Sequence, residues 1–215
     1  MTAEADNFAY VTSPRLPLDA ARTAQRRACG AIAEVPLPLD ASSATARTLV
    51  ATAALGQDHG MTDEPILDPE TQRQVAARLY NHVWDLLDAG DGRTPAQSAE
   101  MVDAVHASNW HWSQIGGLEQ AVVGEWLISR VYAAVGNGPE AVRHAQTAFT
   151  LFHSGAGLPD WLEASVQEGL ARAHLAEGDR DAAEFAAHAA TDALDRISED
   201  EDRALIAGQL ADLGL

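Results

Sequence analysis

Cysteine is nearly absent from this chain, because Cys29 is the single cysteine among 215 residues. One cysteine cannot form an internal disulfide, and without a CxxC partner it offers no cysteine-based zinc site. A disulfide-stapled fold is therefore excluded. We interpret Cys29 as a small packing residue rather than a nucleophile.

Positive charge is also scarce. Fourteen Lys plus Arg residues stand against 32 acidic residues, which gives a formal charge of −18. No basic cluster is longer than "QRRAC", so the sequence argues against nucleic acid or an anionic membrane surface as a partner. No apolar run approaches the roughly 20 residues that cross a bilayer, and the start "MTAEADNF" lacks the features of a signal peptide. We expect a cytoplasmic protein.

Sequence motifs of common enzyme classes are missing. The chain contains no GxSxG, no GxxxxGK[ST], no GxGxxG after a strand and no HExxH. No cofactor is predicted. Sustained two-residue alternation of β-branched residues is absent as well, so the sequence predicts an all-α fold.

Helix start signals punctuate the chain from residue 67 onward. The stretches "LDPE" and "RTPAQ" place the capping residues Asp68 and Thr94 before a proline, and "DWLE" and "SEDE", starting at Asp160 and Ser198, have capping-box spacing. Short links between helices predict antiparallel hairpins. With glycines as stops, these signals predict helices at residues 69–89, 95–115, 118–135, 139–153, 160–176, 179–197 and 200–213.

The first part of the chain has a different composition. Residues 1–66 are rich in Ala, Thr and Ser, and prolines interrupt them. We expect a weakly helical or partly disordered N-terminal segment there, with modest helices at 19–33 and 40–55. Residues 67–215 are expected to form the α-helical domain.

An internal repeat emerges when the chain is shifted by 42 residues. The stretch "RVYAAVGNGPEAVRHAQTA" then aligns with "RAHLAEGDRDAAEFAAHAA". In both, small residues bracket a glycine turn, which lets two helices approach closely. The aligned positions include Arg130 with Arg172, Gly136 with Gly178, Ala141 with Ala183, and Ala148 with Ala190.

The two units resemble tetratricopeptide (TPR) repeats, in which a small residue and an aromatic precede a glycine in the first helix and spaced alanines follow in the second. The resemblance covers about residues 122–197. It implies a right-handed array with a concave groove, and the flanking helices would cap it. The first unit carries Ile128, Ser129, Tyr132, Gly136, Ala141 and Ala148 at those places, and the second carries Leu170, Ala171, His174, Gly178, Ala183 and Ala190.

The repeat departs from the family in three respects. Its period is 42 residues where about 34 is usual. His174 replaces the aromatic, and the expected proline is displaced into a loop as Pro159. Residues 67–215 as a whole are also similar to uncharacterised bacterial TPR-like proteins that share "HAS..HW" and "GEWLISRVYA" patterns, which implies no particular function.

The resemblance points to a binding groove. First helices line the groove of such arrays, which would place Trp126, Arg130, Glu168 and Arg172 there. Paired guanidinium groups bind carboxylate or phosphate bidentately, so the predicted partner is a protein or peptide with an anionic group. The alternative is that both arginines pair internally with Glu125, Glu168 or other acidic neighbours.

A second candidate site surrounds Glu125, which shares a helix face with apolar residues and therefore needs a partner. His111, His144 and Arg143 are the candidates. In a catalytic interpretation, His111 and Glu125 perform general acid–base chemistry. In a metal interpretation, His106, His111, Glu125 and His144 bind one ion, although His106 and His111 diverge on an ideal helix.

The tryptophans favour packing over chemistry. Trp112 and Trp126 suit a helix interface, and Trp110 is the one expected to be partly exposed.

These observations favour a non-enzymatic protein- or peptide-interaction module. The alternative is a small helical enzyme or ligand-binding protein with a His/Glu site, with or without a metal. Alanine-rich helices at the end of the array also allow a homodimer.

Overall fold

The computed structural model describes residues 66–215, so the helices predicted at residues 19–33 and 40–55 lie outside the described residues. Between residues 66 and 215 the chain forms α-helices and no strand, which confirms the all-α prediction for this part. None of these helices combines the length and hydropathy that crossing a bilayer requires. The helices are α3 (Pro69–Asp88), α4 (Pro95–Ser113), α5 (Leu118–Ala134), α6 (Gly138–His153), α7 (Trp161–Glu177), α8 (Arg180–Leu194) and α9 (Asp200–Ala211), with a short 3-10 turn η2 (Gly90–Gly92) after α3.

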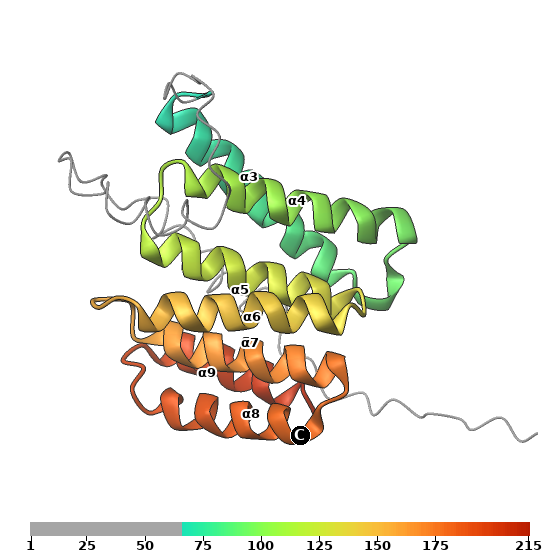
Figure 1. Cartoon of the computed structure of the whole chain (residues 1–215), viewed down its shortest axis with the longest axis vertical. Helices are drawn as coiled ribbons and strands as arrows, with labels where there is room; N and C mark the ends of the chain where they lie inside the picture. Colours follow the sequence, from blue (N-terminus) through green and yellow to red (C-terminus); the bar gives the residue numbers. More distant parts are fainter. Residues whose placement is uncertain (1–65) are drawn as a thin grey trace, which may run out of the picture.

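The helices form a stack that follows the order of the chain. Helices α3 and α4 lie at one end, α5, α6 and α7 follow, and α8 with α9 lies at the other end (Figure 1). Each helix contacts the next one along the chain. Helix α7 also contacts α5 and α9, so it touches four other helices and holds a central position in the stack.

The first two helices begin where their capping residues predict. The Asp68 carboxylate accepts hydrogen bonds from the backbone N–H of Glu70 and Thr71, at 3.1 and 3.0 Å. Thr94 and Gln97 form a reciprocal capping box at the start of α4. These side chains satisfy backbone donors that have no partner inside the helix.

The capping boxes predicted at Asp160 and Ser198 are wrong. Asp160 precedes α7 but makes no capping bond there; its carboxylate instead accepts a hydrogen bond from the backbone N–H of Ser198, at 2.8 Å. Helix α9 begins at Asp200, as predicted, but its N-cap is Glu199 in place of Ser198, and no side chain caps it. The tertiary contact between the starts of α7 and α9 therefore replaces two local caps.

Two turns 42 residues apart have the same local structure. Gly136 and Gly178 adopt positive φ angles of 78° and 91°, a conformation that favours glycine. The next residues, Asn137 and Asp179, each donate a backbone hydrogen bond of 2.9 Å to the carbonyl five residues earlier, on Tyr132 and His174. The side chains of Asn137 and Asp179 then cap α6 and α8.

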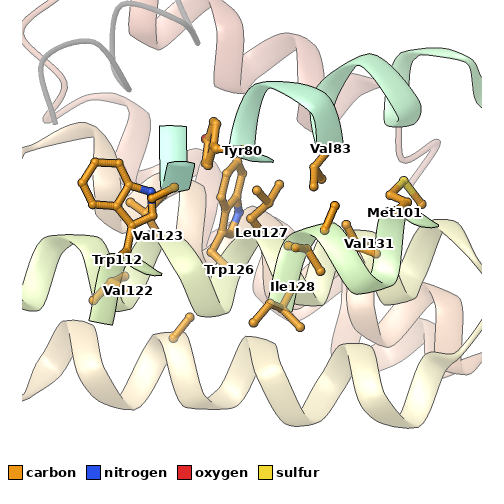
Figure 2. Packing of buried hydrophobic residues seen from close by; sticks show 14 of the residues in the cluster. Tyr80, Val83, Met101, Trp112, Val122, Val123, Trp126, Leu127, Ile128 and Val131 are labelled. Atoms are coloured by element: carbon orange, nitrogen blue, oxygen red, sulfur yellow. The ribbon is translucent and has the colours of Figure 1, made fainter. Parts of the chain in front are cut away.

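The main hydrophobic core lies between α3, α4, α5, α6 and α7. Helix α5 supplies the most residues to it, and Figure 2 shows Val122, Trp126, Leu127 and Val131 among them. Burying each such side chain contributes roughly 1.5–3 kcal/mol. Trp112 and Trp126 are buried and Trp110 is 43% exposed, which confirms all three predictions for the tryptophans.

Helix α6 begins in close contact with the end of α7, at Gly138. A Cβ atom at Gly138 would lie 2.5 Å from the Cα of Glu177 and 2.7 Å from its backbone nitrogen. Backbone atoms cannot move aside as a flexible side chain can, so only glycine fits here.

We predict that Gly138→Ala lowers the free energy of unfolding of the full chain by about 1–3 kcal/mol, because the new methyl group forces α6 away from α7. Urea denaturation measures this change. Gly92→Ala is the control, since no atom lies within 4 Å of a Cβ there, and it should stay within about 0.5 kcal/mol of the original chain. Equal stability of both variants would contradict the close approach.

Candidate functional site

Two arginines from neighbouring helices meet at one buried carboxylate. Glu168 on α7 is 0% exposed. Arg130 on α5 donates to both of its oxygens through Nη1, at 3.3 and 3.2 Å. Arg172, one turn after Glu168 on α7, donates through Nε at 2.8 Å and also through Nη2. We call these three residues the arginine network.

Aromatic rings and a fourth helix extend the arginine network. The Arg130 guanidinium lies 5.3 Å from the Trp84 ring centroid on α3 and 5.8 Å from that of Trp126 on α5, in cation–π contact. The two indole rings are 6.0 Å apart. On the other side, Arg172 Nη2 donates to the backbone carbonyl of Gln209 on α9, at 3.2 Å. The surroundings of the arginine network thus include α3, α5, α7 and α9.

The pKa values in the network follow from burial and mutual charge. Burial, with the neighbouring charge of Arg172, lowers the pKa of Arg130 to about 10 despite the opposing attraction of Glu168. Arg130 therefore remains charged at neutral pH. Burial acts to raise the pKa of Glu168, but the charges and hydrogen bonds of Arg172 and Arg130 outweigh it, so this pKa lies below its usual range.

All the residues predicted to line the groove come together, but they are engaged with one another. Trp126 is 4% and Glu168 0% exposed, while the side chains of Arg130 and Arg172 keep 15% and 22% exposure. The internal pairing of both arginines with Glu168, weighed as the alternative, is what the structure shows. A partner can reach only the outer edges of the two guanidinium groups.

A second polar cluster lies where α4, α5 and α6 meet. The Glu125 carboxylate on α5 accepts hydrogen bonds from His144 Nδ1 on α6, at 2.6 Å, and from Asn109 Nδ2 on α4, at 3.3 Å. His144 is therefore the partner of Glu125 among the three candidates. His144 Nε2 accepts from Arg143 Nη2, at 2.6 Å.

Two more aromatic side chains complete this cluster. The Tyr132 ring stacks on the His144 ring, with centroids 5.5 Å apart and planes 14° apart. His106 on α4 meets both rings edge-on, and its Nε2 is 3.0 Å from the Tyr132 hydroxyl. We call His106, Asn109, Glu125, Tyr132 and His144 the histidine cluster.

His111 lies apart from the histidine cluster. Its Nδ1 donates to Gln72 Oε1 on α3, so the structure does not pair His111 with Glu125. The proposed metal set of His106, His111, Glu125 and His144 is likewise not assembled. Between residues 66 and 215, no group of three or more His, Cys, Asp or Glu side chains is placed to hold a metal ion.

Sequence reasoning did not assign several residues of these sites. Tyr132 was expected to share a helix face with Glu125, seven positions away, but it was given no role in the site. For Asn109, one weak feature of the sequence indicated a place in the site: it lies about one helical turn after His106. Trp84 and Gln209 join the surroundings of the arginine network through tertiary packing alone.

Comparison with protein-family models, with curated proteins and with solved structures finds no match. The function is therefore argued from the geometry of the two clusters.

We predict that Glu168→Gln lowers the free energy of unfolding by about 3 kcal/mol, because it leaves two mostly buried guanidinium groups without their shared counter-charge. Urea denaturation of the full chain at neutral pH measures the loss. Glu163→Gln, on the same helix, removes a carboxylate whose pairing with Arg196 is largely exposed, and it should change stability by less than about 1 kcal/mol. A similar small effect of both substitutions would show that the buried network does not stabilise the fold.

Proposed function

We propose that the chain is a non-enzymatic interaction module. In this proposal its helices form a TPR-like right-handed array of antiparallel hairpins, and the surface around the arginine network takes a protein or peptide with an anionic group. The observation that carries the proposal is a surplus of hydrogen-bond donors around Arg130 and Arg172.

The order of helix contacts supports a repeat array. If α5–α6 and α7–α8 are successive hairpins, the first helix of one contacts the first helix of the next, and α5–α7 and α7–α9 are both in contact. The matching turns at Gly136 and Gly178 agree with this arrangement. The buried alanines at positions 141 and 183, each at the same point of its second helix, permit the close approach that hairpins of this kind need.

The donor surplus has two sources. Two guanidinium groups share the single carboxylate of Glu168, so the network carries a net charge of +1 in a chain of net charge −18. The indole N–H groups of Trp84 and Trp126 are buried and have no hydrogen-bond partner among residues 66–215. These N–H groups add to the donor surplus, and a bound chain would meet that surplus at the guanidinium edges.

The free edges of the guanidinium groups define where an anion would bind. Arg130 bonds Glu168 through Nη1 alone, and Arg172 through Nε and Nη2. Arg130 Nη2 and Arg172 Nη1 make no hydrogen bond to any residue from 66 to 215. An added carboxylate would meet these nitrogens.

The test is a binding screen of the full chain against an array of peptides of varied sequence. We expect the retained peptides to be enriched in Asp and Glu, with binding that weakens as salt rises. Arg172→Gln should abolish retention while Arg130 and Glu168 remain paired. Arg180→Gln, at an exposed arginine paired with Glu184 on α8, is the matched control and should bind normally.

The proposal fails if no peptide is retained, or if Arg172→Gln retains the same peptides as the unaltered chain. Retention of basic peptides instead would assign the interaction to the acidic surface and not to the arginine network.

A second candidate function is a helical enzyme or ligand-binding protein whose site is the histidine cluster. The Glu125–His144 pair favours it, since a carboxylate that orients a histidine is a common general-base arrangement. In this proposal the general base is His144, which replaces His111 of the sequence-based interpretation. Arg143, which covers Nε2, would have to move aside for the base to act.

Hydrolysis of p-nitrophenyl acetate by the full chain tests the second candidate. Turnover above the buffer rate that is lost in Glu125→Gln would support it, provided that Glu100→Gln keeps this turnover. Glu100 is an exposed glutamate on α4 that bonds His82 on α3. The buffer rate alone, or equal turnover in both variants, would exclude general-base catalysis of ester hydrolysis at this pair.

A further inference from the structure

The histidine cluster is the polar joint between α4 and the α5–α6 pair. Among the described residues, two side-chain hydrogen bonds connect α4 to α5: His106 with Tyr132, and Asn109 with Glu125. The helices approach closely at this joint, because a Cβ on Gly124 would lie 2.0 Å from Asn109 Oδ1. Both contacts therefore depend on the relative position of α4 and α5.

The contacts on the other side of α4 are independent of this joint. Ser108 Oγ donates to the backbone carbonyl of Ala76 on α3, at 2.9 Å, and His111 bonds Gln72 on the same helix. Opening of the joint would thus leave α3 and α4 connected to each other.

Hydrogen bonding assigns a role to each ring nitrogen of His144. The Glu125 carboxylate can only accept, so Nδ1 carries the proton. Arg143 can only donate, so Nε2 carries a lone pair.

His106 is the titratable group of α4 that faces the pair. Helix α6 presents His144 and Arg143 to it, with Glu140 nearby; α5 presents Glu125 and Tyr132; and α4 itself contributes Asp103. Partial burial, together with His144 and Arg143, outweighs the attraction of Glu125 and Asp103. The pKa of His106 therefore lies below its usual range.

We infer that this joint is acid-sensitive: protonation of His106 beside His144 and Arg143 loosens α4 from α5 and α6, while the α3–α4 contacts persist. The inference goes beyond the proposed function and does not depend on it.

Proton linkage gives the direction in which pH changes the stability of the joint. A histidine whose pKa is lowered in the folded chain binds fewer protons there than in the opened chain. The stability of the joint is complete above the ordinary histidine pKa of about 6.5, and it falls as the pH drops below that value.

Hydrogen exchange of the full chain at pH 7.5 and pH 5.5 tests the inference. After correction for intrinsic exchange rates, we expect the protection of amides in α4 to fall several-fold at pH 5.5. Protection in α8 should change less. In His106→Gln, which keeps a polar group near Tyr132 but cannot titrate, the fall in α4 should disappear.

The matched control is His188→Gln, because His188 is exposed on α8 and, among the residues that the structure describes, bonds only to a carbonyl of its own helix. This variant should keep the fall in α4. Unchanged α4 protection in the original chain, an equal fall in α4 and α8, or a fall that persists in His106→Gln would each overturn the inference.

A measurement without any variant provides a second check. NMR titration of the histidine ring protons should show His106 titrating at lower pH in the folded chain than in urea. An equal or higher midpoint in the folded chain would also overturn the inference.

Discussion

Placing Glu168 in the interior between two arginines is the constraint on which the rest of this structure depends. A carboxylate that is fully removed from water is stable only when charged and hydrogen-bonding partners surround it. Arg130 and Arg172 meet this need from α5 and α7, and the Gln209 carbonyl extends the network to α9. Because a displaced helix would leave a buried charge unpaired, the network specifies the relative position of these helices more strictly than apolar contacts alone would.

The same network links architecture to the proposed binding surface. Two guanidinium groups for one carboxylate leave positive charge in an acidic protein. Beside it, Trp84 and Trp126 add indole donors that find no acceptor in the described part of the chain. Stability and recognition therefore compete for the same side chains. The histidine cluster differs, because both ring nitrogens of His144 have hydrogen-bond partners and burial lowers the pKa of its neighbour His106.

The helical part of the fold was predictable wherever local rules determine it. Asp68 and Thr94 cap their own helices, and Gly136 and Gly178 terminate theirs in the left-handed conformation, so a window of a few residues contains the information. Asp160 and Ser198 had similar local signals but bond to each other across 38 positions. A tertiary partner that competes with a local cap cannot be recognised from spacing.

The sequence predicted many of the residues that make up the candidate sites, but not which of these residues bond to one another. The sequence indicated that Glu125 needs a partner. His144 and not His111 is that partner because the rotation of α4 against α3 directs His111 to a hydrogen bond with Gln72. Glu168 and Arg172 are one turn apart on a helix, which predicts their contact. The convergence of Arg130 on the same carboxylate required knowing that α5 packs on α7.

A double-mutant cycle between Arg130 and Glu168 tests the central claim most directly. Urea unfolding of the original chain, Arg130→Gln, Glu168→Gln and the double variant gives the interaction energy of the pair across α5 and α7. If the buried network positions the helices, the interaction should stabilise the fold by at least about 1.5 kcal/mol. A value below about 0.5 kcal/mol would show that apolar packing alone holds the stack together, and would contradict the account.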